Sequence, residues 1–227
     1  MSTPSDASSP RRSPLLAFAG ALVSTALDFG LLALALGGAT PVLSHPQALG
    51  LLAVWLVGAV ILALVRPVRA RSGTRRDTDP LLLLALFLLP LLTPACAAWG
   101  ERIGLWPIPG GWPGVILTAG GLALRIAAMM QLGSRFDPSV AILPGHALET
   151  RGLYARIRHP GYAGALLAAL GAVIAFRSAF GLIPVVLMAV ALTLRVRNEE
   201  RALEAHFGEA FREYRAKSGA FLPRFAR

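Results

Sequence analysis

Residues 81–99 read LLLLALFLLPLLTPACAAW, a run without a single charged side chain. An α-helix needs about 20 consecutive apolar residues to cross the hydrocarbon core of a bilayer, so this stretch predicts a transmembrane helix. Pro90 and Pro94 lie inside it, and each removes a backbone hydrogen bond. We therefore expect a kinked helix whose freed carbonyls are satisfied by neighbouring helices.

Similar apolar stretches lie on both sides of this run. The same criterion marks spans at residues 15–36, 49–65 and 115–132. The last stretch, residues 162–194, is too long for one helix, and we expect Phe176-Arg177-Ser178 and Pro184 to divide it into two short helices. The sequence thus predicts an all-α, polytopic integral membrane protein with five or six transmembrane helices and a C-terminal helical hairpin.

Composition and charge agree with a membrane protein. The chain is 55% hydrophobic and 15% charged, whereas a soluble domain has about 25% charged residues. The net charge of +10 raises the possibility of a nucleic-acid partner, but the arginines lie in loops beside apolar runs, where they set membrane topology. We therefore exclude a nucleic-acid partner. The predominance of arginine over lysine, with abundant Ala, Leu and Gly, indicates a GC-rich genome and hence a bacterial inner membrane.

The arginines also predict the orientation. Basic segments precede the first span and follow the second span, the fourth span and the hairpin, whereas residues 37–47 between the first two spans carry no Lys or Arg. Because positive residues favour the cytoplasmic side, both termini are expected to be cytoplasmic. Residues 1–13 are rich in Ser and Pro and are expected to form a disordered cytosolic tail. Residues 14–111 would hold the N-terminal transmembrane helices.

The end of the chain changes character. Residues 198–214 are charged, and Leu203, Phe207, Phe211 and Tyr214 recur every three or four positions along one face. This pattern predicts an amphipathic cytosolic helix that lies against the membrane surface or covers a site.

Two charged residues lie inside otherwise apolar spans. Asp28 and Arg125 would each cost about 2.5–3.5 kcal/mol at the bilayer centre. Arg125 is near the cytoplasmic end of its span, so its long side chain can reach the interface. Asp28 has no such route, and the sequence assigns it no role.

The segment before the hairpin concentrates polar, aromatic and Gly/Pro residues. Pro160 suits the first turn of a helix. Arg158 and His159 would then lie at the positive N-terminus of that helix, placed to hold an anionic group such as a carboxylate. Gly161 and Gly164 permit a close approach of backbone.

The hairpin should bring a second polar group back to the same level. Its two ends lie side by side, so Arg195, Glu199 and Glu200 are expected next to the Arg158-His159-Pro160 entrance. Arg195 and Glu199 are four residues apart and share a helix face.

These residues form a familiar pattern. The chain contains Gly152-Leu-Tyr154, Arg158-His159-Pro160-x-Tyr162-x-Gly164, Arg195-x-x-x-Glu199-Glu200, Phe207-Gly208, Tyr214 and Leu222-Pro223, and upstream Leu124-Arg125, Leu132-Gly133 and His146-x-Leu148-x-Thr150. In this order and spacing, residues 122–223 resemble the isoprenylcysteine carboxyl methyltransferase family, which is related to membrane phospholipid N-methyltransferases. The first three spans contain no diagnostic motif.

The resemblance implies an enzyme that uses S-adenosylmethionine, with residues 112–227 as the catalytic region. By analogy the cofactor would be lined by His146, Ala147, Leu148, Tyr154, His159, Pro160, Gly161 and Tyr162. Glu199 would bind the cofactor through its ammonium group, and Arg195 would bind the substrate; Arg195 and Glu199 are the expected catalytic pair. The chain departs from the family pattern at Gly161 (commonly serine), Glu149 (usually apolar) and Phe211 (usually tyrosine), so the family's substrate is not carried over to this chain.

The chemistry favours an anionic acceptor on a lipophilic molecule. A carboxylate needs no general base, and an arginine can hold it bidentately. An amine would have to lose a proton, and Arg195 would repel its protonated form. We expect a lipophilic small molecule, a lipid or a prenylated acceptor that enters sideways from the membrane lipids, while the cofactor enters from the cytosol.

Two other classes of protein also fit the sequence. Membrane sterol or steroid reductases have a similar C-terminal architecture and use NADPH. In such an enzyme the 2′-phosphate of NADPH would be bound by Arg151, Arg156 and Arg158. A non-enzymatic transporter or scaffold would use Asp28 and Arg125 as pathway residues, although the chain has no internal repeat. A metal site is not expected, because Cys96 is the single cysteine and no Cys/His cluster exists.

Overall fold

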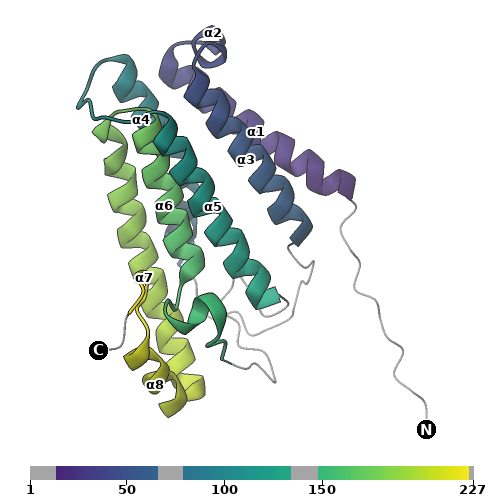
Figure 1. The fold of residues 1–227 in the computed structure, drawn as a ribbon, viewed down its shortest axis with the longest axis vertical. Helices are drawn as coiled ribbons and strands as arrows, with labels where there is room; N and C mark the ends of the chain where they lie inside the picture. Colours follow the sequence, from purple (N-terminus) through teal and green to yellow (C-terminus); the bar gives the residue numbers. More distant parts are fainter. Residues whose placement is uncertain (1–13, 66–78, 134–147, 225–227) are drawn as a thin grey trace.

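The computed structural model describes residues 14–65, 79–133 and 148–224 (Figure 1). The predicted tail at residues 1–13 and two of the predicted cofactor residues, His146 and Ala147, lie outside this part of the chain. Within it, the regular secondary structure is helical, with two isolated β-bridges as the exceptions.

The helices follow the predicted order of apolar runs. They are α1 (Pro14–Leu36), α2 (Ala39–Leu43), α3 (Pro46–Val65), α4 (Pro80–Arg102), α5 (Trp112–Leu132), the 3₁₀ turn η2 (Gly152–Ala155), α6 (Pro160–Ala175), the 3₁₀ turn η3 (Ala179–Gly181), α7 (Leu182–Phe207) and α8 (Glu209–Lys217). Five segments are long and apolar enough to cross a membrane, and α6 is a shorter apolar helix. The prediction of an all-α, multi-pass membrane protein is confirmed.

The outer surface of the bundle is apolar. Large hydrophobic side chains are exposed on several helices, among them Leu34 on α1, Leu81 on α4, Ile116 on α5 and Val186 on α7. An apolar surface of this extent in a soluble monomer would be an aggregation hazard. Facing lipid, it is the expected surface of a membrane bundle, since the backbone groups beneath it are paired within helices.

The helices α5 and α6 form the closest contact of the bundle. A Cβ at Gly164 would lie 2.5 Å from the carbonyl oxygen of Gly121, and one at Gly121 would lie 2.4 Å from the amide nitrogen of Ala168. Thr118 adds a hydrogen bond from its hydroxyl to the Ala168 carbonyl, at 3.2 Å. Small residues let two helix backbones approach closely in lipid. The expected close approach is therefore found at Gly164, whereas a Cβ at Gly161 would meet its nearest neighbour at an ordinary 3.8 Å.

The hairpin differs in detail from the prediction. The chain reverses between Phe176 and Gly181, where Arg177 adopts a left-handed φ of 51°. Pro184 does not divide the apolar stretch, because it lies in the first turn of α7. Backbone N–H groups in the first turn of a helix have no intrahelical acceptor, so a proline there costs no hydrogen bond. The second helix of the hairpin is also not short, because α7 has 26 residues.

The predicted amphipathic helix is not one helix. Its first part, from residue 198 to Phe207, is the end of α7. Gly208 then adopts a left-handed φ of 54°, which ends α7, and α8 begins at Glu209. The change in polarity near Arg195 marks the edge of the apolar run and not the end of a helix, since Arg, Glu, Ala and Leu are all good helix formers.

Candidate active site at the mouth of the hairpin

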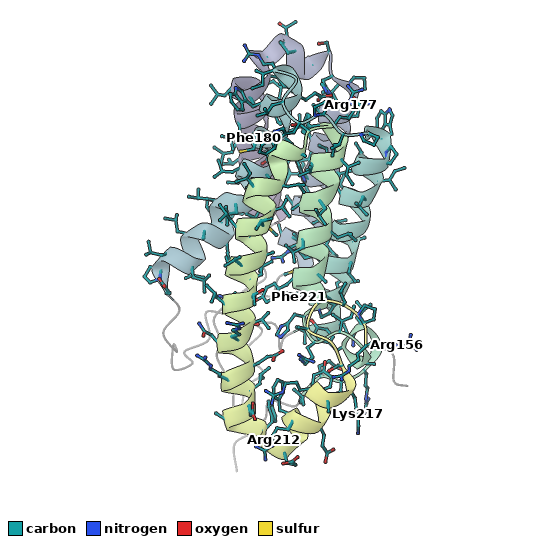
Figure 2. The ribbon with its side chains drawn as sticks, turned by 90° about the vertical axis from the view of Figure 1, so that its left-hand side faces the viewer. Arg156, Arg177, Phe180, Arg212, Lys217 and Phe221 are labelled. Carbon is teal, nitrogen blue, oxygen red and sulfur yellow. The ribbon has the colours of Figure 1, made fainter. Side chains whose placement is uncertain are left out.

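The two helices of the hairpin meet at a polar end, which we call the hairpin mouth: residues Arg158–Tyr162 and Arg195–Glu200. Pro160 is at the first position of α6, and His159 is its N-cap residue. In Figure 2, Arg156, Lys217 and Arg212 lie at the end of the molecule that carries α8, and Arg177 and Phe180 lie at the opposite end. The mouth and the turn of the hairpin are therefore at opposite ends of the bundle.

Three side chains form a closed network at the mouth. The Tyr162 hydroxyl donates to Glu199 Oε1 at 2.5 Å and accepts from Arg195 Nε at 2.7 Å. Arg195 Nε is also 2.9 Å from Glu199 Oε1. Arg195 is 6% exposed. A charged group buried to this extent requires such partners, and the network fixes the plane of the guanidinium.

A second network continues from the first through His159. Its Nδ1 is 3.5 Å from Glu199 Oε2, and its Nε2 is 3.2 Å from Glu200 Oε1. Arg158 Nε is 2.7 Å from the same oxygen of Glu200. The rings of His159 and Tyr162 stack, with centroids 5.7 Å apart. The predicted juxtaposition of the Arg-His-Pro entrance and the Arg…Glu-Glu exit is confirmed.

The segment that leads into α6 is held by the buried Tyr154 and the half-buried Tyr214. The Tyr154 hydroxyl donates to the Ala128 carbonyl of α5 at 3.2 Å, and the Tyr214 hydroxyl of α8 donates to the Tyr154 carbonyl at 2.6 Å. Burial raises the pKa of Tyr154 above its ordinary value and raises the pKa of Tyr214 to about 12. Both hydroxyls therefore stay protonated, as hydrogen-bond donors must.

The two charged residues of the apolar spans have different surroundings. Arg125 Nη1 donates to the Gly161 carbonyl in the first turn of α6, at 3.1 Å, so this arginine packs at the mouth. Asp28 is buried on α1, which packs chiefly against α2, α3 and α4. Asp28 is therefore not part of the mouth.

Most of the predicted site residues gather at this end. Arg195, Glu199, His159 and Tyr162 are in direct contact, as described above. Pro160 is buried, Tyr154 is 8% exposed, and Leu148 and Gly161 are half-buried. Among the described residues, no group of three or more His, Cys, Asp or Glu side chains is placed to hold a metal ion.

Sequence reasoning placed Glu200 near Arg158 but did not assign Arg158 its partners. This arginine was expected to hold an anionic ligand, whereas its Nε binds a carboxylate of the chain itself, on Glu200. Its Nη1 donates to the carbonyls of Arg215 and Ser218. Hairpin geometry was a usable signal for Glu200. The contacts with the two carbonyls had no such signal in the sequence, because a backbone acceptor is present at every position.

Comparison with known proteins points to one family. Residues 114–205 match the family model of the isoprenylcysteine carboxyl methyltransferase family. The protein-S-isoprenylcysteine O-methyltransferase of Schizosaccharomyces pombe is 33% identical over 109 residues, which cover 45% of each chain. The Homo sapiens enzyme of the same name is 32% identical over 118 residues, 48% of this chain and 40% of its own. The matched part is thus less than half the length of these relatives.

A solved structure resembles the fold over a longer stretch. It is that of the eukaryotic intramembrane Ras methyltransferase, isoprenylcysteine carboxyl methyltransferase, with a TM-score of 0.55 and 20% sequence identity, covering 86% of this chain and 73% of that one. At this identity the likeness concerns the fold. The stretch that matches the family model contains the whole hairpin mouth. The resemblance of this chain to the isoprenylcysteine carboxyl methyltransferase family is therefore confirmed, in sequence over residues 114–205 and in the fold of the membrane bundle.

Proposed function

We propose that this protein transfers a methyl group from S-adenosylmethionine to a lipophilic acceptor, most favourably one with a carboxylate. The observation that carries the proposal is the closed network of Tyr162, Arg195 and Glu199 at the hairpin mouth. It lies within the segment that matches the family model. A fixed arginine beside a fixed carboxylate offers a place for an anion and a place for a cation within one polar site.

The side chains at the hairpin mouth suit the charged groups of the cofactor. The Glu199 carboxylate suits an ammonium group, and His159 with the positive N-terminus of α6 suits a carboxylate. Gly161 leaves room beside this first turn, since a Cβ there would be 3.8 Å from its nearest neighbour. We assign cofactor binding to the following residues: His146, Ala147, Leu148, Tyr154, His159, Pro160, Gly161, Tyr162 and Glu199. When bound, S-adenosylmethionine supplies an electrophilic methyl group on a sulfonium.

Arg195 is proposed to hold the acceptor. Tyr162 and Glu199 engage its Nε and so orient the guanidinium, which can grip a carboxylate through two parallel hydrogen bonds. A carboxylate oxygen is already deprotonated at neutral pH. Held by Arg195 beside the methyl group that the cofactor would supply, it would form the new O–CH₃ bond as the S–CH₃ bond breaks. The electron pair would stay on sulfur, and the products would be a methyl ester and S-adenosylhomocysteine. Positioning of the two reactants is the main contribution asked of the protein.

The acceptor and the location follow from the membrane setting. We propose a prenylated molecule, a lipid or another lipophilic carboxylate, reached sideways through the surrounding membrane lipids. The relatives named above are isoprenylcysteine O-methyltransferases, which supports a carboxylate on a prenylated group. We further propose a bacterial inner membrane with both termini in the cytoplasm. In this proposal, residues 14–111 supply N-terminal membrane helices and residues 112–227 the catalytic region.

The test is calorimetric binding of S-adenosylhomocysteine to the detergent-purified protein. Saturable binding is expected for the wild type, with a loss of roughly 30-fold or more in Glu199→Gln, because the charged partner of a buried group is removed. Glu204→Gln is the matched control on the same helix, since Glu204 pairs with Arg215 instead. Absence of binding by folded wild-type protein, with binding of NADPH in its place, would overturn the proposal in favour of a reductase.

A further inference from the structure

One side chain beside the proposed site joins three separate elements. Arg158 lies just before α6, its Nε is 2.7 Å from Glu200 Oε1 on α7, and its Nη1 donates to the carbonyls of Arg215 and Ser218 at the end of α8. The last carbonyls of a helix lack intrahelical donors, and a positive charge there is favoured by the helix dipole. Arg158 therefore caps α8 and binds α7 with the two edges of one guanidinium.

The backbone strengthens the same junction. Residues 218–224, which we call the C-terminal strap, lie along the residues that enter α6. Arg158 N donates to the Gly219 carbonyl at 2.8 Å, His159 N donates to the Ala220 carbonyl at 3.0 Å, and Gly219 N donates to the Arg156 carbonyl at 3.0 Å. Phe221 of the strap packs against a hydrophobic cluster of α6 and α7, and Figure 2 shows it beside these helices. The strap thus forms a second layer behind the N-terminus of α6.

The two consecutive glutamates of α7 have different partners. Glu199 contacts Tyr162 and Arg195, whereas Glu200 contacts Arg158. His159 lies between them, with one ring nitrogen toward each carboxylate. The position of His159 therefore depends on where Glu200 is held, and Glu200 is held by Arg158.

We infer that Arg158 is a positioning residue, which fastens Glu200 and the C-terminal strap together and thereby fixes His159 and the start of α6 for cofactor binding. This inference rests on the proposed function. Arg158 acts through these neighbours and not through contact with the cofactor. Its effect is accordingly on cofactor affinity, whereas Tyr162, Arg195 and Glu199 keep their own contacts when Arg158 changes.

Lysine cannot replace this arginine. An ammonium is a single point charge on a flexible stem, so it cannot serve a carboxylate on α7 and two carbonyls on α8 through a rigid fork. In Arg158→Lys we expect S-adenosylhomocysteine affinity to fall about tenfold, while turnover at saturating cofactor falls far less. Glu200→Gln breaks the same junction from α7 and should have the same effect.

The experiment combines calorimetric binding of S-adenosylhomocysteine with hydrogen–deuterium exchange of the ligand-free protein. Four variants are compared with the wild type: Arg158→Lys, Glu200→Gln, the double variant, and Arg201→Lys as a control at an exposed arginine next to Glu200. The first three should show faster exchange at the amides of Arg158, His159 and Gly219. The double variant should lose about tenfold in affinity and not about a hundredfold, because both changes break one junction. The control should match the wild type.

Other outcomes would overturn the inference. Weaker binding without faster exchange would make Arg158 a direct ligand of the cofactor. Faster exchange with unchanged affinity would make the junction a purely structural contact, and additive losses in the double variant would separate Arg158 from Glu200. If the wild type binds no S-adenosylhomocysteine, the proposed function fails, and the exchange data still show whether the three-way junction itself exists.

Discussion

The two ends of the hairpin carry clusters built from the same kinds of side chain. At the turn end, Arg177 Nη2 is 2.7 Å from Glu101 Oε1, and His45 Nε2 is 3.0 Å from Glu101 Oε2. At the mouth, glutamates meet Arg158, Arg195 and His159 in the same way. Charge and burial alone do not separate these clusters, because the carboxylates Glu101, Glu199 and Glu200 are similarly exposed.

Their places in the chain separate them. The turn-end cluster joins the link between α2 and α3, the end of α4 and the turn of the hairpin, so it ties the N-terminal helices to the hairpin. All members of the mouth cluster lie within residues 114–205, and they include a tyrosine hydroxyl between an arginine and a glutamate. An ion pair at a helix end is therefore no indicator of function by itself. We expect the turn end to affect stability and the mouth to affect activity.

The largest effect is expected at the mouth. Arg195→Lys should lower turnover of a prenylated carboxylate acceptor roughly 100-fold or more, because the oriented fork that is proposed to hold the acceptor is lost. The measurement is the initial rate with radiolabelled S-adenosylmethionine, beside calorimetric binding of S-adenosylhomocysteine. Binding should be weakened much less than turnover. Unimpaired turnover would remove Arg195 from the acceptor site.

The next effect concerns the contact of α5 with α6, the helix whose first turn belongs to the mouth. Gly164→Ala should lower the free energy of unfolding by roughly 1–3 kcal/mol, because its methyl group would meet the α5 backbone. Gly161→Ala, one turn away, has space for the same methyl group and should be neutral. Thermal unfolding in detergent, followed by far-UV circular dichroism, measures both. Equal stability of the two variants would mean that α5 and α6 can separate without cost.

Glu101→Gln should give an effect of similar or smaller size at the turn end. The loss of charge weakens the contacts of Glu101 with His45 and Arg177, and we expect a destabilisation of roughly 1–2 kcal/mol. S-adenosylhomocysteine affinity should stay at the wild-type value. A marked loss of affinity in folded protein would break the distinction between the two ends and connect the turn with the cofactor site.

The smallest expected effect concerns the titration of the tyrosines at alkaline pH. In Tyr162→Phe, the remaining tyrosines are Tyr154 and Tyr214, and burial raises both pKa values. A tyrosine whose pKa is higher in the folded than in the unfolded protein contributes to stability at pH values below its unfolded-state pKa, which is near 10. For Tyr214 this contribution is lost as the pH rises through the folded-state pKa of about 12. Absorbance of tyrosinate at alkaline pH should show no titration near pH 10. Ionisation of a tyrosine there would contradict the burial of this region.

The membrane spans and the mouth were predictable from sequence for physical reasons. Crossing a bilayer needs an apolar run of fixed length, so α3, α4 and α5 are visible as such runs. A hairpin returns its ends to one level, so the contact of His159 with Glu199 and Glu200 followed from topology.

Other features had no comparable signal. The continuation of α7 to Phe207 was hidden by a change in polarity that leaves helix propensity intact. The hydrogen bond of Tyr154 to the Ala128 carbonyl uses a backbone acceptor, which the sequence does not distinguish from any other. The contact of His45 with Glu101 joins residues 56 apart in sequence and depends on how the N-terminal helices pack.

The short length of α6 has a consequence for where the proposed reaction would take place. Its 16 residues span about 24 Å, whereas the hydrocarbon core of a bilayer is about 30 Å thick. The turn that precedes α7 carries Phe180, which packs against Trp99 and Trp106, and such aromatic groups favour the interface. With the turn anchored there, we expect the start of α6 to lie below the opposite membrane surface. Under the proposed function, the lipid thickness of the host membrane then becomes a variable of the reaction, because it sets how deep a polar head group must be drawn to reach Arg195.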